Sequence, residues 1–143
     1  MSDIVSITSR VSTAIVLDAS VVVEVLLASV DGKRTMQRLV AEDVPLHAPE
    51  LLDIEVLHVL RRAVARELMT TRRAEQAIRV LESFPLTRHA HGPLRRRCWQ
   101  LRANLSVYDA TYVALAEGLG ARLFTRDARL GRAQGLATAV EVV

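Results

Sequence analysis

The sequence of 143 residues is poor in the side chains that build redox, zinc and base-stacking sites. Its single cysteine, Cys98, excludes an internal disulfide, so we expect a protein of the cytoplasm. The four histidines are scattered and form no zinc-ligand spacing. Aromatic residues amount to two Phe, two Tyr and one Trp, so we expect no base-stacking platform and place Trp99 in the core.

Long apolar runs and phosphate-binding loops are also missing. The apolar runs are far too short to span a bilayer, and the N-terminus does not resemble a secretion signal. Lys33 is the only lysine, and it follows no glycine-rich loop of the kind that binds nucleoside triphosphates. The net charge of +3 therefore depends on arginine, whose planar guanidinium matches phosphate oxygens.

What the sequence does contain indicates one α/β domain. Half of the residues are apolar, and the length is sufficient for a proper core. Short apolar runs alternate with helical segments over 14–143, which predicts a three-layer α/β/α domain with a mostly parallel central sheet. Residues 1–13 show no period and are expected to form a flexible N-terminal arm. The expected strands cover 14–18, 44–48, 85–87, 122–125 and 139–143. The expected helices cover 21–29, 35–41, 50–68, 72–83, 92–103, 106–118 and 129–134.

Four carboxylates occur where such a fold would bring them together. Asp18 ends the first expected strand, and Asp127 follows a later one. Glu55 lies in the first turns of a long expected helix, and Asp109 opens another. Ligand sites of parallel sheets form at the carboxyl ends of the strands. Acids gathered there repel one another unless a cation joins them, and Mg²⁺ prefers oxygen ligands. The pattern predicts metal-assisted phosphoryl chemistry.

Each of these positions also has a plain structural explanation. Asp18 and Asp127 suit turns at strand ends. Asp109 stands three residues after Ser106, which is the spacing of a capping box. Ser20 suits the cap of the helix expected at 21–29, although its hydroxyl would also serve a metal-bound water. All four structural explanations together, at successive strand ends and helix starts, are less satisfactory than a shared site.

The helix expected at 50–68 offers two acids for this site. Glu55 borders the broad apolar arc of the helix, with Arg62 and Arg66 on the same stripe about two and three turns along. Asp53 falls inside the arc, yet a first-turn acid also suits the helix dipole. The pattern leaves both acids open as the metal ligand and suits contacts of the two arginines with nucleic-acid phosphates. A solvated surface face is the alternative.

Four segments also carry a family resemblance, in their order and spacing. They are Ile15–Ser20, Leu52–Arg62, Leu105–Glu117 and Leu123–Asp127. From about Ile15 to Val143, the chain resembles the PIN-domain ribonucleases of the VapC toxin type, from type II toxin–antitoxin modules. The resemblance implies a quartet of acids, without Asp53, and small hydroxyl groups nearby. The implied acids are Asp18, Glu55, Asp109 and Asp127, and the hydroxyl positions are Ser20 and Thr125.

The resemblance further implies an endoribonuclease that uses Mg²⁺ or Mn²⁺, a cognate VapB-type antitoxin and a homodimer. The apolar helices at 21–27 and 56–64 fit an interface. RNA contacts are expected from arginines at the rim, among them Arg62, Arg66 and the run Arg95–Arg97. One alternative is a receiver-like sensor of metal or phosphate, which is disfavoured because this chain has no lysine late in its sequence. Another is a non-catalytic PIN-like module, which is disfavoured because the quartet of acids is complete.

Overall fold

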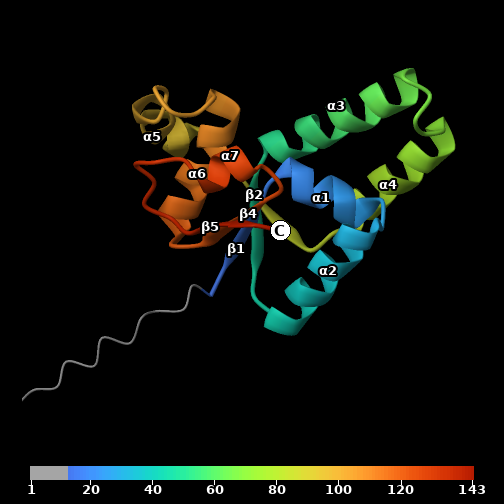
Figure 1. The fold of residues 1–143 in the computed structure, drawn as a ribbon, viewed down its shortest axis with the longest axis horizontal. Helices are drawn as coiled ribbons and strands as arrows, with labels where there is room; N and C mark the ends of the chain where they lie inside the picture. The colour runs from blue at the N-terminus through green and yellow to red at the C-terminus, as the bar shows by residue number, and fades with distance from the viewer. Residues whose placement is uncertain (1–12) are drawn as a thin grey trace, which may run out of the picture.

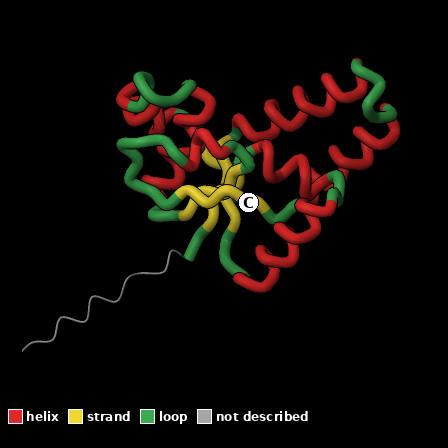
Figure 2. The backbone as a smooth tube through the Cα atoms, in the orientation of Figure 1, coloured by secondary structure: helices red, strands yellow, loops and turns green. Residues whose placement is uncertain are grey.

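The computed structural model describes residues 13–143, which form a five-stranded sheet between two layers of helices (Figure 1; Figure 2). The strand order is β3-β2-β1-β4-β5, and every neighbouring pair is parallel. The predicted α/β/α fold is confirmed. The strands are β1 (Ile15–Leu17), β2 (Leu46–Pro49), β3 (Leu86–His89), β4 (Arg122–Thr125) and β5 (Val140–Val142). The predicted N-terminal arm lies, apart from Thr13, outside the described residues.

The chain covers one face of the sheet before the other. Connections from β1 through β2 to β3 place α1–α4 on one side, and the return to β4 and β5 places α5–α7 on the other (Figure 1). Right-handed crossovers in opposite directions produce this division. The first group is α1 (Ala19–Leu26), α2 (Val30–Glu42), α3 (Leu51–Ala65) and α4 (Thr71–Ser83). The second is the 3₁₀ turn η1 (Gly92–Leu94), α5 (Arg95–Gln100), α6 (Val107–Leu119) and α7 (Ala128–Gly131).

The core lies along the central strands and the helices packed on them. All three residues of β1 have an exposed fraction of 0%, as expected for a parallel strand covered on both faces. Helix α6 is buried continuously from Ala110 to Ala116 and contacts β1, β2 and β4. No helix within the described part of the chain is long and apolar enough to cross a membrane.

Two helix starts differ from the predictions. Helix α1 is capped by Asp18 rather than Ser20, because the Asp18 carboxylate accepts a hydrogen bond from the Val21 backbone N–H at 3.1 Å. Helix α2 begins earlier than expected, because Ser29 Oγ accepts from the Gly32 N–H at 2.9 Å. The charged stretch 31–34, which was expected to separate the helices at 21–29 and 35–41, therefore lies within α2.

Gly32 allows α1 and α2 to approach each other at the backbone. A Cβ atom at this position would lie 2.0 Å from the carbonyl oxygen of Glu24, at which distance the backbone must move. Helices that pack this closely require glycine at the contact.

Three apolar regions are exposed or buried contrary to expectation. On α3, Leu57 and Val59 are about two-fifths exposed, so its core face is narrower than the predicted arc. Most apolar residues of α1 are buried within the domain and offer no face to a partner. The prediction that Trp99 lies in the core is wrong, since it is 65% exposed on α5.

Candidate active site

The four predicted carboxylates lie near the carboxyl ends of β1 and β4, where the strand order reverses direction. Asp18 follows β1 and Asp127 follows β4, so sheet pairing brings these two turns together. Glu55 enters from the second turn of α3, and Asp109 from the first turn of α6. The structure thus brings together residues that lie far apart in the sequence.

Asp18 is the most deeply buried of the four. Asp18 is only 8% exposed. Its Oδ1 accepts hydrogen bonds from Ser20 Oγ at 2.5 Å and from the Val21 N–H at 3.1 Å. Burial raises the pKa of Asp18, hydrogen bonds from Ser20, Thr125 and Val21 oppose the rise, and the negative charge of Asp109 adds to it. Ser20 Oγ also accepts from the backbone N–H of Arg126, so this hydroxyl links the ends of β1 and β4.

Glu55 has a buried oxygen without a partner. The Tyr112 hydroxyl lies near this carboxylate, but neither it nor Glu55 Oε1 has a well-formed hydrogen bond within the described residues, although both atoms are buried. Burial raises the pKa of Glu55, the nearby Tyr112 hydroxyl lowers it, and repulsion from Asp109 and Asp18 raises it again. The pKa of Tyr112 is raised by its burial and by Glu55. An unpaired buried carboxylate oxygen is costly and calls for a ligand.

Asp109 and Asp127 differ in their surroundings. The Asp109 N–H donates to Ser106 Oγ at 3.1 Å, so the predicted cap is present. Burial raises the pKa of the Asp109 carboxyl, with a contribution from Asp127. Asp127 instead forms an ion pair with Arg129 at 3.2 Å, and hydrogen bonds from Arg129 lower its pKa. Thr125 Oγ1 accepts from the Asp127 N–H at 3.0 Å and fixes this turn.

The chemistry of these donors suits a hard divalent cation. Three of the four acids have raised pKa values, so a cation among them would relieve both burial and repulsion. Within residues 13–143, no three acidic, His or Cys side chains converge closely enough to hold an ion as they stand. Asp18 is turned to Ser20 and Asp127 to Arg129. Metal binding therefore requires Asp127 to exchange Arg129 for the cation, whereas Asp18 can keep its hydrogen bond with Ser20.

Asp53 does not compete for this position. Its two carboxylate oxygens accept from Arg88 of β3 at 2.6 and 2.9 Å, which ties α3 to the edge of the sheet. Arg62 and Arg66 are exposed near the end of α3, where Arg66 is the C-cap, so they lie away from the acids. They border a hollow of about 280 Å³ together with Val59.

A larger hollow of about 610 Å³ opens beside Glu55. Val59 borders this hollow as well, so the surface continues along α3 from the acids toward Arg62. Tyr108, one residue before Asp109, forms its opposite edge.

The sequence did not single out three residues of this region. Tyr112 follows Asp109 by three positions and so shares a face of α6 with it, which is the one signal that could have found it. Arg129 and Tyr108 were equally unassigned, because a side chain next to a motif gives no sign of its direction.

Comparison with known proteins adds an independent observation. The family model "PIN domain" matches residues 15–136. The chain is 40% identical to Ribonuclease VapC12 of Mycobacterium tuberculosis over 90% of this chain and 98% of that protein. It is also 40% identical to Ribonuclease VapC1 of the same organism, over 90% and 96% of the two chains.

Solved structures share the fold at lower identity. The crystal structure of Mycobacterium tuberculosis VapC20, described as a Sarcin-Ricin loop cleaving toxin, gives a TM-score of 0.64 at 19% identity, over 86% of this chain and 96% of that one. The crystal structure of VapBC2 from Rickettsia felis, bound to a DNA fragment from its promoter, gives a TM-score of 0.62 at 14% identity, over 90% of this chain and 97% of that one.

Proposed function

The chain belongs to the PIN-domain family, and from this membership we propose that it is the toxin of a type II toxin–antitoxin module and cleaves RNA as an endoribonuclease. The relatives named Ribonuclease VapC match over nearly the whole of both chains, which supports the activity. The observation that carries the proposal is the proximity of Asp18 and Asp109 to Glu55, whose buried Oε1 lacks a well-formed hydrogen bond, with Asp127 near Asp109. A receiver-like sensor is no longer a competing explanation, because the family model covers most of the domain.

The four acids would hold one or two Mg²⁺ or Mn²⁺ ions, which when bound activate the attacking water and neutralise charge on the phosphate. Ser20 orients the Asp18 carboxylate through its hydrogen bond, and Thr125 fixes the backbone ahead of Asp127. Burial limits the hydration of Asp18, so its oxygens are held in place before the substrate binds.

Arginines of α3 supply the positive charge that RNA requires. Arg62 and Arg66 are exposed beyond Val59, which borders the hollows on both sides. They are too far along the helix to join the acids, and their role is to attract phosphates of the approaching strand. Arg97 does not contribute, because both oxygens of Glu117 hold it at 2.6 and 3.1 Å.

The proposed partner is a VapB-type antitoxin, in keeping with the VapBC2 structure of related fold. The hollow beside Glu55 joins apolar residues such as Ile54 and Val59 to an acidic end. A basic side chain of an antitoxin segment would find its counter-charge there and occupy the place of the metal. We also propose a homodimer that uses exposed apolar residues of α3, and location in the cytoplasm.

An RNA cleavage assay tests the proposal. The wild-type protein should cleave in Mg²⁺ or Mn²⁺ and stop in excess EDTA, and Asp109→Asn should abolish cleavage while the protein remains folded. Asp53→Asn is the matched control, because Asp53 forms an ion pair with Arg88, and this variant should keep its cleavage activity. A folded wild-type protein that binds RNA without cleaving it in either metal would identify a non-catalytic PIN module.

A further inference from the structure

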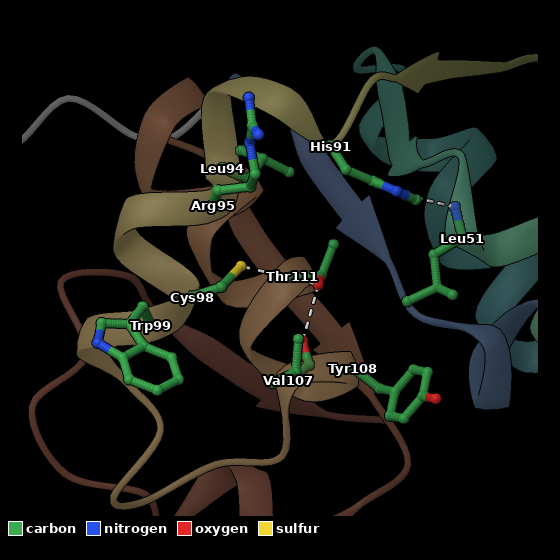
Figure 3. A pocket seen from close by; sticks show the side chains of 9 residues that line it. All are labelled: Leu51, His91, Leu94, Arg95, Cys98, Trp99, Val107, Tyr108 and Thr111. Carbon is green, nitrogen blue, oxygen red and sulfur yellow. Dashed lines mark hydrogen bonds between the residues drawn. The ribbon is translucent and has the colours of Figure 1, made fainter.

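A second hollow adjoins the acidic site, between α5 and the first turn of α6 (Figure 3). Trp99 of α5 and Tyr108 of α6 lie on opposite sides of it, with Cys98 and Thr111 between them (Figure 3). Its volume is about 280 Å³. Pockets for drug-sized ligands begin at roughly 300 Å³, so this hollow accommodates one flat ring system rather than a helix of another protein.

The exposed aromatic side chains of the domain gather at this hollow. Of the Phe, Tyr and Trp residues, three are buried, namely Phe84, Phe124 and Tyr112. The remaining two are Trp99, 65% exposed, and Tyr108, 61% exposed, and both border the hollow. A protein with so few aromatic residues that exposes two beside one hollow has a binding surface there.

The base of the hollow has few free polar groups. Thr111 Oγ1 donates to the Val107 carbonyl at 2.7 Å, and Cys98 Sγ donates to Thr111 Oγ1 at 3.7 Å. These groups already have partners, so the hollow favours stacking and apolar contact over hydrogen bonds to one particular base edge.

Positive charge surrounds the aromatic side chains. The guanidinium of Arg102 stacks on the Trp99 ring, 4.5 Å from its centroid, and Arg95 lines the hollow itself. Arg96 is exposed on the same short helix. Aromatic faces among arginines are the features with which proteins bind single-stranded nucleic acid, since bases stack while the cations hold phosphates.

The hollow adjoins the acidic site, because Leu51 and Tyr108 line both this hollow and the one beside Glu55. Tyr108 also directly precedes Asp109. We propose that the hollow between Trp99 and Tyr108 is a nucleobase subsite, which takes an unpaired base next to the scissile bond. The inference rests on the proposed RNA cleavage and adds the place at which one unpaired base of the RNA is held.

Trp99 is the only tryptophan of the chain, so its fluorescence reports on the hollow directly. The test uses full-length protein in excess EDTA and three probes: a short single-stranded RNA, the same RNA annealed to its complement, and a strand of equal length with abasic sites. The single strand should quench Trp99 emission in a saturable way, whereas the duplex and the abasic strand should not.

Substitutions then measure the contribution to binding, by the fluorescence anisotropy of labelled RNA because the Trp99 variants have no tryptophan. Trp99→Ala should weaken binding of the single strand by about fivefold or more, the effect of losing one stacked base, and leave the abasic strand unaffected. Trp99→Phe should restore most of the affinity. Val40→Ala is the matched control, because Val40 is also 65% exposed but lies on α2, beside the N-terminal end of β2.

The outcomes separate this inference from the proposed function. Equal quenching by the abasic strand, or unchanged single-strand affinity in folded Trp99→Ala, would overturn the subsite even if RNA is cleaved. Quenching by the single strand without any cleavage would support the subsite and refute the nuclease. If Trp99→Ala instead dissociates a dimer and leaves RNA binding intact, the hollow is a contact between copies of this chain and the inference fails.

Discussion

Replacing Glu55 with glutamine should affect stability in opposite ways with and without metal. The substitution keeps the shape of the side chain but removes a charge that Asp18 and Asp109 repel. An unpartnered buried polar atom costs about 1–3 kcal/mol, and a charged one costs more, so the difference between Glu and Gln is the extra cost of the charge. Because Glu55 also borders an open hollow, we expect this difference to be small: Glu55→Gln should raise the free energy of unfolding in EDTA by about 1 kcal/mol.

Metal should reverse this order. At a Mg²⁺ concentration 100 times the dissociation constant, the wild-type protein gains about 2.7 kcal/mol, whereas a variant that has lost a ligand gains much less. Urea unfolding in EDTA and in Mg²⁺ measures both values. Glu75→Gln, on the exposed surface of α4, should change neither. The reasoning is refuted if Glu55→Gln is less stable than wild type in EDTA, or if both proteins gain equally from Mg²⁺.

The same comparison has a defined pH dependence. The pKa of Glu55 is higher in the folded protein than in the unfolded chain, so the folded state binds a proton first as the pH falls. Without metal, wild-type stability should therefore rise as the pH falls from neutral through the raised pKa toward the unfolded value of about 4.3. The advantage of Glu55→Gln should shrink over the same range, and an advantage that grows would contradict the assignment.

Three further predictions concern other parts of the domain. Arg129→Ala frees Asp127 from its ion pair and should tighten Mg²⁺ binding in calorimetry; weaker binding would give Arg129 another role. Substituting Arg62 and Arg66 together with Ala should lower RNA affinity and reduce the slope of log affinity against log salt by about 0.7 for each lost phosphate contact, while the saturating single-turnover cleavage rate stays near wild type. An unchanged slope would make them surface residues only. Gly32→Ala should destabilise the protein by about 1–3 kcal/mol in urea unfolding, because its Cβ meets the α1 backbone; a neutral effect would show that α1 and α2 separate easily.

The sequence was sufficient to predict the position of a side chain where that position depends only on the chain segment that carries it. The unbroken apolar run of β1 predicted a buried strand, and the acids at strand ends and helix starts followed from the order of the elements. The capping box at Ser106 was equally local. These features need only chain order and period, without knowledge of what packs against them.

Prediction failed where distant segments decide the outcome. Trp99 is 65% exposed on α5, and no periodicity reveals whether another segment will cover a side chain. Asp53 was separated from Glu55 only by the resemblance, whereas the structure gives the reason, its ion pair with Arg88 of β3. The approach of the Tyr112 hydroxyl to Glu55 joins α6 to α3 across the fold and was equally inaccessible.

The pairing of β1 with β4 sets the moment at which this chain acquires its acidic cluster during synthesis. Ile15 pairs with Arg122, so the turn after β1 has no β4 beside it until synthesis has passed residue 125. Pairings this distant in sequence also form slowly, because a long loop must close before the strands meet. A nascent chain therefore carries Asp18 and Asp127 apart until β4 pairs with β1, and the full acidic cluster, with the repulsion that a metal would offset, forms only with that pairing.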